Sequence, residues 1–396
     1  MVPPEGLPGN DVTSFANTGG ICMDVAHFDA LTRMLAFRQS RRSVAIVLGA
    51  VATAILTQGE ETQAGKKKKK PLCLNGQTIK ASGNKRKKLL KQGASPGACA
   101  GSCTPRCDGT SCGGDDGCGG ACGCSGNAVC NGGTCMPCTV VCTGTPLGCG
   151  SQLTQALLDG GTIALCPGTY SAGAGVFEIR KDTTLVGAGP EDDPGSNTIL
   201  DGEGARLVLF ANTSRKLTMH GLRVINGFGG QGGGMLAGEG TDVRVTNCAF
   251  VQNTGNGGGA ILSFGNLRLT NTLFDQNEAT NSDGGGVLLI DSDQSFVTNC
   301  TFTGNTSGMF GGGLSANNSQ VTITGTEFRD NTADRGGGLS MDGGTVNLDS
   351  ATLITGNVAT ELGGGAVRFS GVLNRNGATI SGNSAPRQPD CAGGCT

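Results

Sequence analysis

The sequence of 396 residues contains no tryptophan, one tyrosine and two histidines. Sugar-binding platforms usually expose tryptophan or tyrosine rings, so this shortage weakens a carbohydrate-binding role. The sequence also lacks a long apolar run. Its longest stretch of this kind, Val44–Leu56, is shorter than the roughly 20 apolar residues that a membrane-spanning helix needs. We therefore expect no transmembrane span in the mature chain.

Charged residues are few and unevenly distributed. The chain has 29 Lys and Arg against 31 Asp and Glu, so its net charge is close to zero. Residues 66–91 hold eleven basic residues, whereas residues 150–396 hold 13 basic and 22 acidic residues, a net charge of −9. Because an acidic body repels a phosphate backbone, we expect no nucleic-acid partner.

The first 64 residues have the layout of a leader. Residues 1–22 are rich in Gly, Pro and Asn and are interpreted as a mis-called N-terminal extension before a true start at Met23. In residues 23–64, Arg41 and Arg42 precede the apolar stretch and a small-residue cleavage site follows it, as in an export signal. The arginine pair resembles a twin-arginine signal, and the general secretory route is the alternative. Both predict an exported protein, extracellular or at the cell surface.

Residues 65–98 form a Lys-rich segment that includes the run Lys66–Lys70. Blocks of like charge repel one another and remain solvated, so a disordered linker is the expected structure. A sharper alternative is contact with an anionic surface, to which each basic residue would contribute about 1 kcal/mol.

Cysteines are concentrated in residues 99–149, which hold twelve of the 19. Such density in a Gly-rich stretch of an exported chain predicts a disulfide-rich module. Cys135 and Cys138 have the spacing of half a zinc site, but no histidine lies nearby and no second pair follows at the spacing of a zinc ribbon. Disulfides are therefore the preferred interpretation.

The body from residue 150 repeats at intervals of 24 to 28 residues, and three kinds of residue recur in step. Glycine triplets occupy 232–234, 257–259, 284–286, 311–313, 336–338 and 363–365. Each repeat also holds one phenylalanine or isoleucine at an equivalent position: Phe250, Phe274, Phe302, Phe328, Ile354 and Ile380. The asparagines are Asn226, Asn253, Asn277, Asn305, Asn331, Asn357 and Asn383. This period predicts an all-β fold, a single-stranded right-handed parallel β-helix over residues 150–396.

Each repeated residue type has a structural role in such a stack. Equivalent residues lie about 4.8 Å apart in adjacent coils, so the phenylalanines should stack and the asparagine amides should form a ladder. Asparagine also tolerates the left-handed backbone that a turn needs, and the glycine triplets are interpreted as corners with positive φ. No Gly-Lys-Ser or Gly-Lys-Thr follows any triplet, which excludes a phosphate-binding loop.

Two apolar columns follow the glycine triplets. The residue directly after each triplet is expected to face inward: Met235, Ala260, Val287, Leu314, Leu339 and Ala366. The residue two places further on forms a second inward column that only the last member breaks: Ala237, Leu262, Leu289, Ala316, Met341 and Arg368. This alternation is typical of strands with one buried face.

Two details test the register of the coils. Residues 151–158 carry apolar residues at helical spacing and are predicted to form a helix that caps the first coil. Cys248 and Cys300 lie two coils apart, about 9.6 Å, which exceeds the roughly 7 Å limit for a disulfide, so both are predicted to be free, buried thiols. Cys391 and Cys395 either close a small terminal loop or pair with the module upstream.

Two paired motifs, Gly-Gly-Gly-Ala260-Ile and the Phe-x-x-Asn of Phe250–Asn253 and its three successors, resemble the repeats of polymorphic outer membrane proteins. Residues Cys166–Tyr170 and Ile199–Gly202 are similar to the first coils of the pectate-lyase-like superfamily. The resemblance covers the body of the chain. It implies a right-handed β-helix that is exposed at the cell surface and associated with adhesion, and it specifies a fold rather than an activity.

β-Helix enzymes that cleave acidic polysaccharides need carboxylates clustered across neighbouring coils, with Arg, Lys or His nearby. Asp291 and Asp293 are the best local pair, Asp275 and Asp330 are out of register with each other, and His220 is the single histidine of the body. Counting from the glycine triplets, the counterparts of the first pair carry no carboxylate: Phe264, Asn266, Asn318 and Gln320.

The sequence therefore assigns no catalytic, cofactor-binding or metal-binding residue. The preferred function is an exported, cell-surface or secreted β-helix protein with an adhesion, binding or envelope-structural role. Its candidate partners are a polysaccharide or another cell-envelope polymer. The alternative is a polysaccharide lyase or glycoside hydrolase acting on acidic polysaccharide. Partner contacts are expected on three variable loops: Glu278–Asp283, Asp291–Ser295 and Thr332–Arg335.

Overall fold

The computed structural model describes residues 70–74, 77–81, 85, 87–88, 95–96, 124, 127–131, 133–173 and 175–395. The expected N-terminal extension, the export signal and most of the Lys-rich and cysteine-rich segments lie outside the described residues. Within the Lys-rich segment, a three-stranded antiparallel sheet contains β1 (Lys70–Leu74), β2 (Gln77–Ala81) and β3 (Ser95–Pro96). Part of the expected linker is therefore β-structure. The sequence places Asn-Gly between β1 and β2, the pair that favours a two-residue hairpin turn.

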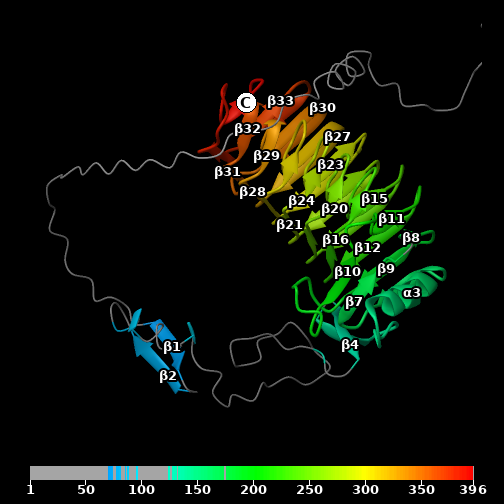
Figure 1. Ribbon diagram of the computed structural model, residues 1–396. Helices are drawn as coiled ribbons and strands as arrows, with labels where there is room; N and C mark the ends of the chain where they lie inside the picture. The colour runs from blue at the N-terminus through cyan, green and yellow to red at the C-terminus, as the bar shows by residue number, and fades with distance from the viewer. Residues whose placement is uncertain are drawn as a thin grey trace, which may run out of the picture. The chain divides into compact units, whose positions relative to one another are not determined.

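The body is a parallel β-solenoid whose coils stack in chain order, from α3 (Pro146–Leu157) at one end to β33 (Ala366–Arg368) at the other (Figure 1). A nine-stranded sheet takes one strand from each coil: β7 (Gly168–Ser171), β10 (Thr198–Asp201), β13 (Arg223–Ile225), β17 (Ala249–Val251), β21 (Leu273–Asp275), β25 (Thr301–Thr303), β28 (Glu327–Arg329), β31 (Leu353–Thr355) and β35 (Thr379–Ser381). A six-stranded sheet begins two coils later: β14 (Phe228–Gly229), β18 (Thr254–Gly255), β22 (Glu278–Ala279), β26 (Thr306–Ser307), β29 (Thr332–Arg335) and β32 (Val358–Leu362).

The third sheet has two parallel rows that meet at two long strands, β27 (Leu314–Thr324) and β30 (Leu339–Leu348). One row contains β8 (Phe177–Ile179), β11 (Leu209–Ala211), β15 (Met235–Ala237), β19 (Ile261–Ser263), β23 (Val287–Ile290), β33 and β36 (Cys391–Ala392). The other row contains β6 (Gly161–Ala164), β9 (Thr183–Val186), β12 (Lys216–His220), β16 (Asp242–Thr246), β20 (Asn266–Thr270), β24 (Ser295–Thr298) and β34 (Val372–Asn374). Every pairing along these rows is parallel, which confirms the predicted fold.

The first coil is covered by α3 and by a hairpin. The helix begins five residues before the predicted start because Thr145 caps it, accepting a 3.2 Å hydrogen bond from Gly148 N, and Pro146 suits the first helical position. Leu153 and Leu157 are buried against the core. The hairpin consists of β4 (Ala128–Asn131) and β5 (Thr134–Pro137), and Val129 of β4 packs on the outer side of the first coil.

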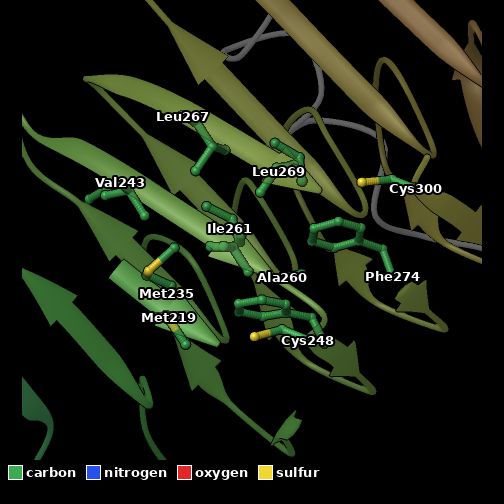
Figure 2. Close-up of a cluster of buried hydrophobic side chains, with 14 of the residues drawn as sticks. Met219, Met235, Val243, Cys248, Ala260, Ile261, Leu267, Leu269, Phe274 and Cys300 are labelled. Carbon is green, nitrogen blue, oxygen red and sulfur yellow. The ribbon is translucent and has the colours of Figure 1, made fainter. Parts of the chain in front are cut away.

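Stacked rings occupy the centre of the core. The rings of Phe250, Phe274, Phe302 and Phe328 are parallel to within 12°, and successive centroids lie 5.4, 4.6 and 4.7 Å apart. All four side chains are fully buried, and Ile354 and Ile380 continue the column. Figure 2 shows Phe274 among the apolar side chains of neighbouring coils. The predicted phenylalanine column is confirmed.

A ladder of buried asparagine amides runs beside the rings from Asn253 to Asn383. Each Nδ2 donates to the Oδ1 of the asparagine one coil on, at 2.9 to 3.0 Å. Each Nδ2 also donates to a backbone carbonyl one coil back, such as Phe274 O from Asn305 at 2.9 Å. At the last coil, Asp390 Oδ1 accepts from both the backbone N–H and Nδ2 of Asn383 at 3.1 Å, so a carboxylate ends the ladder.

The prediction was wrong for Asn226, which is not a rung of the ladder. Val224 pairs with Phe250, which places Gly227 opposite Asn253, and Gly227 N donates to Asn253 Oδ1 at 2.9 Å. Asn226 lies one place earlier and has a φ of 50°. The left-handed residue of each turn is therefore the one before the ladder position, and the ladder asparagines do not adopt positive φ.

The second glycine triplet was also placed one residue too early. Met235 pairs with Ile261, so Gly258, Gly259 and Ala260 are the counterparts of residues 232–234. The inward column two places on accordingly contains Ser263 rather than Leu262. Only the first glycine of each corner has positive φ, as at Gly311. The middle one is required for space, since a Cβ on Gly312 would overlap the Gly337 carbonyl of the next coil.

Around the first coil and at the terminus, cysteines in the described residues form disulfides. The bonds are Cys124–Cys135, Cys138–Cys166, Cys142–Cys149 and Cys391–Cys395. Cys135 and Cys138 therefore belong to different disulfides rather than to one metal site. Cys138–Cys166 joins the end of the hairpin to the first coil, and Cys391–Cys395 closes the small terminal loop.

Cys248 and Cys300 are free and buried, as predicted from the register. Figure 2 shows both within the apolar cluster that contains Phe274. Each thiol donates to a backbone carbonyl two residues earlier, at 3.3 and 3.4 Å, and Thr272 occupies the same position in the coil between them. Burial raises the pKa of both thiols to about 12.

We expect both thiols to resist alkylation in the folded chain, because they are inaccessible and only a thiolate reacts at a useful rate. After unfolding in denaturant without reductant, iodoacetamide should label Cys248 and Cys300 fully. Peptide mapping by mass spectrometry with and without denaturant measures this. A Cys248–Cys300 bond, or rapid labelling of the folded chain, would contradict the register described here.

Candidate functional site

The predicted carboxylates do not meet in a catalytic pair. Asp291 is exposed and its Oδ1 accepts a 2.7 Å hydrogen bond from Asn318 Nδ2, as the predicted register requires. The pairing offset changes from 27 residues at Ile290–Asn317 to 26 at Ser295–Val321. The corner of the coil that contains Asp293 is therefore one residue longer than the same corner of the next coil. The extra residue has no counterpart in that next coil.

Counting from the glycine triplets also misplaced the preceding coil. Ser263 pairs with Leu289, so the residue that follows in register beside Asp291 is Gly265 and not Phe264. The carboxylates of the second pair, Asp275 and Asp330, also do not face each other. Asp275 pairs with Thr303, which in turn pairs with Arg329, so Asp330 lies one place further along its coil, as predicted.

His220 ends β12 and faces outward, half-buried, opposite Thr246 of the next coil. Burial lowers the pKa of its imidazole below the ordinary value, so the ring is neutral at neutral pH. No hydrogen bond or ion pair joins it to Asp291, which lies at a corner several coils further on. In the described part of the chain, no group of three or more His, Cys, Asp or Glu side chains has the arrangement of a metal site.

The three predicted contact loops are partly strands. Glu278–Ala279 is β22 and Thr332–Arg335 is β29, both in the six-stranded sheet, and Asp291–Ser295 is the corner before β24. The Arg335 side chain already has two partners within the chain. Its Nη2 lies 2.7 Å from Glu361 Oε2, and its guanidinium lies over the Phe310 ring. The three segments are only partly exposed: Glu278 and Asp291 face solvent, whereas Ala279, Ser292 and Ala333 are buried. The hydrogen-bonded sheet therefore fixes more of these segments than the sequence predicted.

Sequence reasoning missed a group of cationic side chains on the outer face of the third sheet. We define the basic face as the outward side of β12, β16, β20 and β24. In-register pairing places Lys216 beside Asp242 and places Arg244 beside Arg268, with Phe296 next to Arg268. The signal was present in the sequence, since Arg244 and Arg268 directly precede two residues of the same inward column, Val245 and Leu269.

Contacts within the basic face hold both guanidinium groups in place. Arg244 Nη2 lies 3.1 Å from Asp242 Oδ2, and Arg268 Nη1 lies 2.6 Å from Asp242 Oδ1. The Arg268 guanidinium also lies 5.6 Å from the centroid of the Phe296 ring, within the range of a cation–π contact. One carboxylate is therefore shared by two arginines, and both arginine side chains remain accessible, at 56% and 32% exposure.

Comparisons with known proteins agree with the fold. Residues 207–385 match the family described as the right handed beta helix region, which fits the pectate-lyase-like superfamily. The chain is 30% identical over 173 residues to "Probable outer membrane protein pmp7" of Chlamydia pneumoniae, covering 40% of this chain and 18% of that protein. It is 26% identical over 125 residues to "Probable autotransporter YfaL" of Escherichia coli K12, covering 30% and 10%.

A third relative comes from a eukaryote. "Metabotropic glutamate receptor-like protein R" of Dictyostelium discoideum is 32% identical over 114 residues, which cover 28% of this chain and 7% of that protein. No solved structure matches the chain significantly.

These relatives are much longer than the part they share with this chain, which spans 18% or less of each. Within the described residues, no helix combines the length and apolar character needed to cross a membrane. The stacked coils and the matched region together show that the body of the chain is a right-handed parallel β-helix.

Proposed function

We propose that the chain is an exported, cell-surface protein whose β-helix serves adhesion or another binding role rather than catalysis. The observation that carries this proposal is how the polar groups of the repeats are used. The asparagine amides of the ladder are bonded inward between coils, so the repeated polar residues maintain the scaffold. The surface available to a partner is the variable outer side of the sheets.

Two of the relatives support a surface location. One is named as a probable outer membrane protein and the other as a probable autotransporter, and they share 40% and 30% of this chain. A long, rigid solenoid suits such a role, because each coil contacts only its neighbours and extends the molecule in one direction. The leader-like residues 23–64 are compatible with export.

Surface exposure and attachment are the first test. The full chain with an epitope tag before residue 396 should be digested by protease added to intact producing cells, whereas a cytoplasmic marker should survive. Deleting the chain should reduce cell–cell aggregation or retention on a surface, and re-expression should restore it. A protected tag together with unchanged attachment would contradict the proposal.

The enzymatic alternative is tested separately. Purified full chain should leave the length of polygalacturonate unchanged with and without Ca²⁺, as followed by unsaturated product and by reducing ends. Cleavage that disappears in Asp291→Ala or His220→Ala, with the fold retained, would replace the binding role with a lyase or hydrolase role. Thr306→Ala, at an exposed position of the six-stranded sheet, serves as the matched surface variant.

A further inference from the structure

The basic face differs in charge from the rest of the solenoid. Among the strand residues of β12, β16, β20 and β24 there are three cations, Lys216, Arg244 and Arg268, and a single carboxylate, Asp242. Residues 150–396 as a whole carry a net charge of −9. These four strands therefore carry a local excess of positive charge on a body that is acidic as a whole, and such an excess attracts an anionic partner and orients it.

The arginines of this face lack the individual partners that other ion-paired arginines have. In the described part of the body, Arg180 pairs with Glu178 and Arg335 pairs with Glu361, one carboxylate each. Arg244 and Arg268 instead share Asp242, although their strands are adjacent and their backbones lie about 4.8 Å apart. Like charges placed directly opposite each other on neighbouring strands repel, so a second carboxylate would relieve this arrangement.

We propose that the basic face binds a carboxylate-rich polypeptide segment, with Arg244 and Arg268 each receiving an acidic side chain. Arginine suits this task because its planar guanidinium offers several donors and can hold a carboxylate with two hydrogen bonds. Asp242 and Phe296 fix the two guanidinium groups before the partner arrives, which reduces the entropy lost on binding. This inference deepens the proposed binding role and rests on it.

The observations favour a polypeptide over the other anionic polymers. A sugar ring needs an open aromatic platform, but the chain has no tryptophan, its one tyrosine is buried, and the Phe296 ring is already in contact with Arg268. A nucleic acid would meet the acidic remainder of the body with its whole phosphate backbone. Outward threonines beside the arginines, such as Thr246 and Thr270, can bond the main chain of an extended segment.

Binding of fluorescent poly-L-glutamate to the purified full chain, measured by anisotropy at low ionic strength, tests the proposal. Arg244→Gln/Arg268→Gln should weaken binding about tenfold or more, equivalent to roughly 1.4 kcal/mol. The matched control, Arg329→Gln/Arg335→Gln, removes the same charge from the two other sheets and should change binding less than about twofold. Raising the salt concentration should weaken binding of the unchanged chain. Unfolding curves verify that both double variants remain folded.

Three outcomes would overturn the inference: no binding of poly-L-glutamate, an equal loss in both double variants, or tighter binding of polygalacturonate than of poly-L-glutamate. The last would assign the face to an acidic glycan. The cell attachment assay separates this inference from the proposed function. If deleting the chain abolishes attachment and Arg244→Gln/Arg268→Gln leaves both attachment and poly-L-glutamate binding intact, the binding role stands and the basic face is not its site.

Discussion

Replacing Asn305 by alanine is expected to lower the free energy of unfolding by about 3 to 5 kcal/mol. The Asn305 amide donates to Phe274 O and to Asn331 Oδ1, each at 2.9 Å, and its Oδ1 accepts from Asn277 N and Nδ2 at 3.0 and 2.9 Å. All of these groups are buried. The substitution would leave several buried polar atoms without partners, and each such atom costs about 1 to 3 kcal/mol.

Chemical denaturation followed by circular dichroism measures this effect. Asn256→Ala is the matched control, because Asn256 is exposed and accepts only long hydrogen bonds from Thr280 and Asn281, at 3.3 and 3.2 Å. Its loss should be smaller than about 0.5 kcal/mol. Similar losses at Asn305 and Asn256 would show that the ladder contributes no more than a surface hydrogen bond does.

Much of the scaffold was predictable because residues at equivalent positions of adjacent coils contact each other. Their side chains must therefore be able to pack against each other or to form hydrogen bonds. A phenylalanine column and an amide ladder are each visible as one residue type at a nearly constant period, and both are present from Phe250 and Asn253 onward. The register was predictable only to within one residue. The pairing offset is 26 at Ala237–Ser263 but 24 at Asp242–Asn266, so the corner between them is two residues shorter in one coil.

That corner lies after both register errors and does not explain them, because the pairing offset is 26 at Val224–Phe250 and still 26 at Met235–Ile261. Both errors arose where the repeated residue type is absent from its position. Gly227 occupies the ladder position of its coil, and Ala260 occupies the place of the third glycine. A neighbouring glycine or asparagine happened to satisfy the pattern in each case.

The basic face was harder to predict, because its character depends on which side chains share a partner. The sequence places Arg244 and Arg268 at equivalent positions of adjacent repeats, but it does not show which carboxylate each of them contacts. That Asp242 contacts both is visible only in the three-dimensional structure. The covering of the first coil by β4 was likewise not predictable, since disulfide connectivity cannot be deduced from sequence.

Replacing Phe302 by alanine is expected to lower the free energy of unfolding by about 3 to 5 kcal/mol. The ring is fully buried and stacks on both sides, against Phe274 at 4.6 Å and Phe328 at 4.7 Å between centroids. Alanine would leave a cavity that hydrogen-bonded coils cannot collapse to fill, and it would remove two stacking contacts worth about 0.5 to 1.5 kcal/mol each. Phe302→Leu should recover part of the loss.

Double variants decide whether the rings act as a column or as separate core residues. Phe302→Ala and Phe328→Ala remove adjacent rings that contact each other, so their combined effect should depart from the sum by more than about 0.5 kcal/mol. Phe302→Ala and Phe250→Ala remove rings that are separated by Phe274, so their effects should add. Exposed Phe228→Ala controls for loss of a ring as such. Additivity in both pairs would contradict the column, because neighbouring coils would then be stabilised independently of each other's rings.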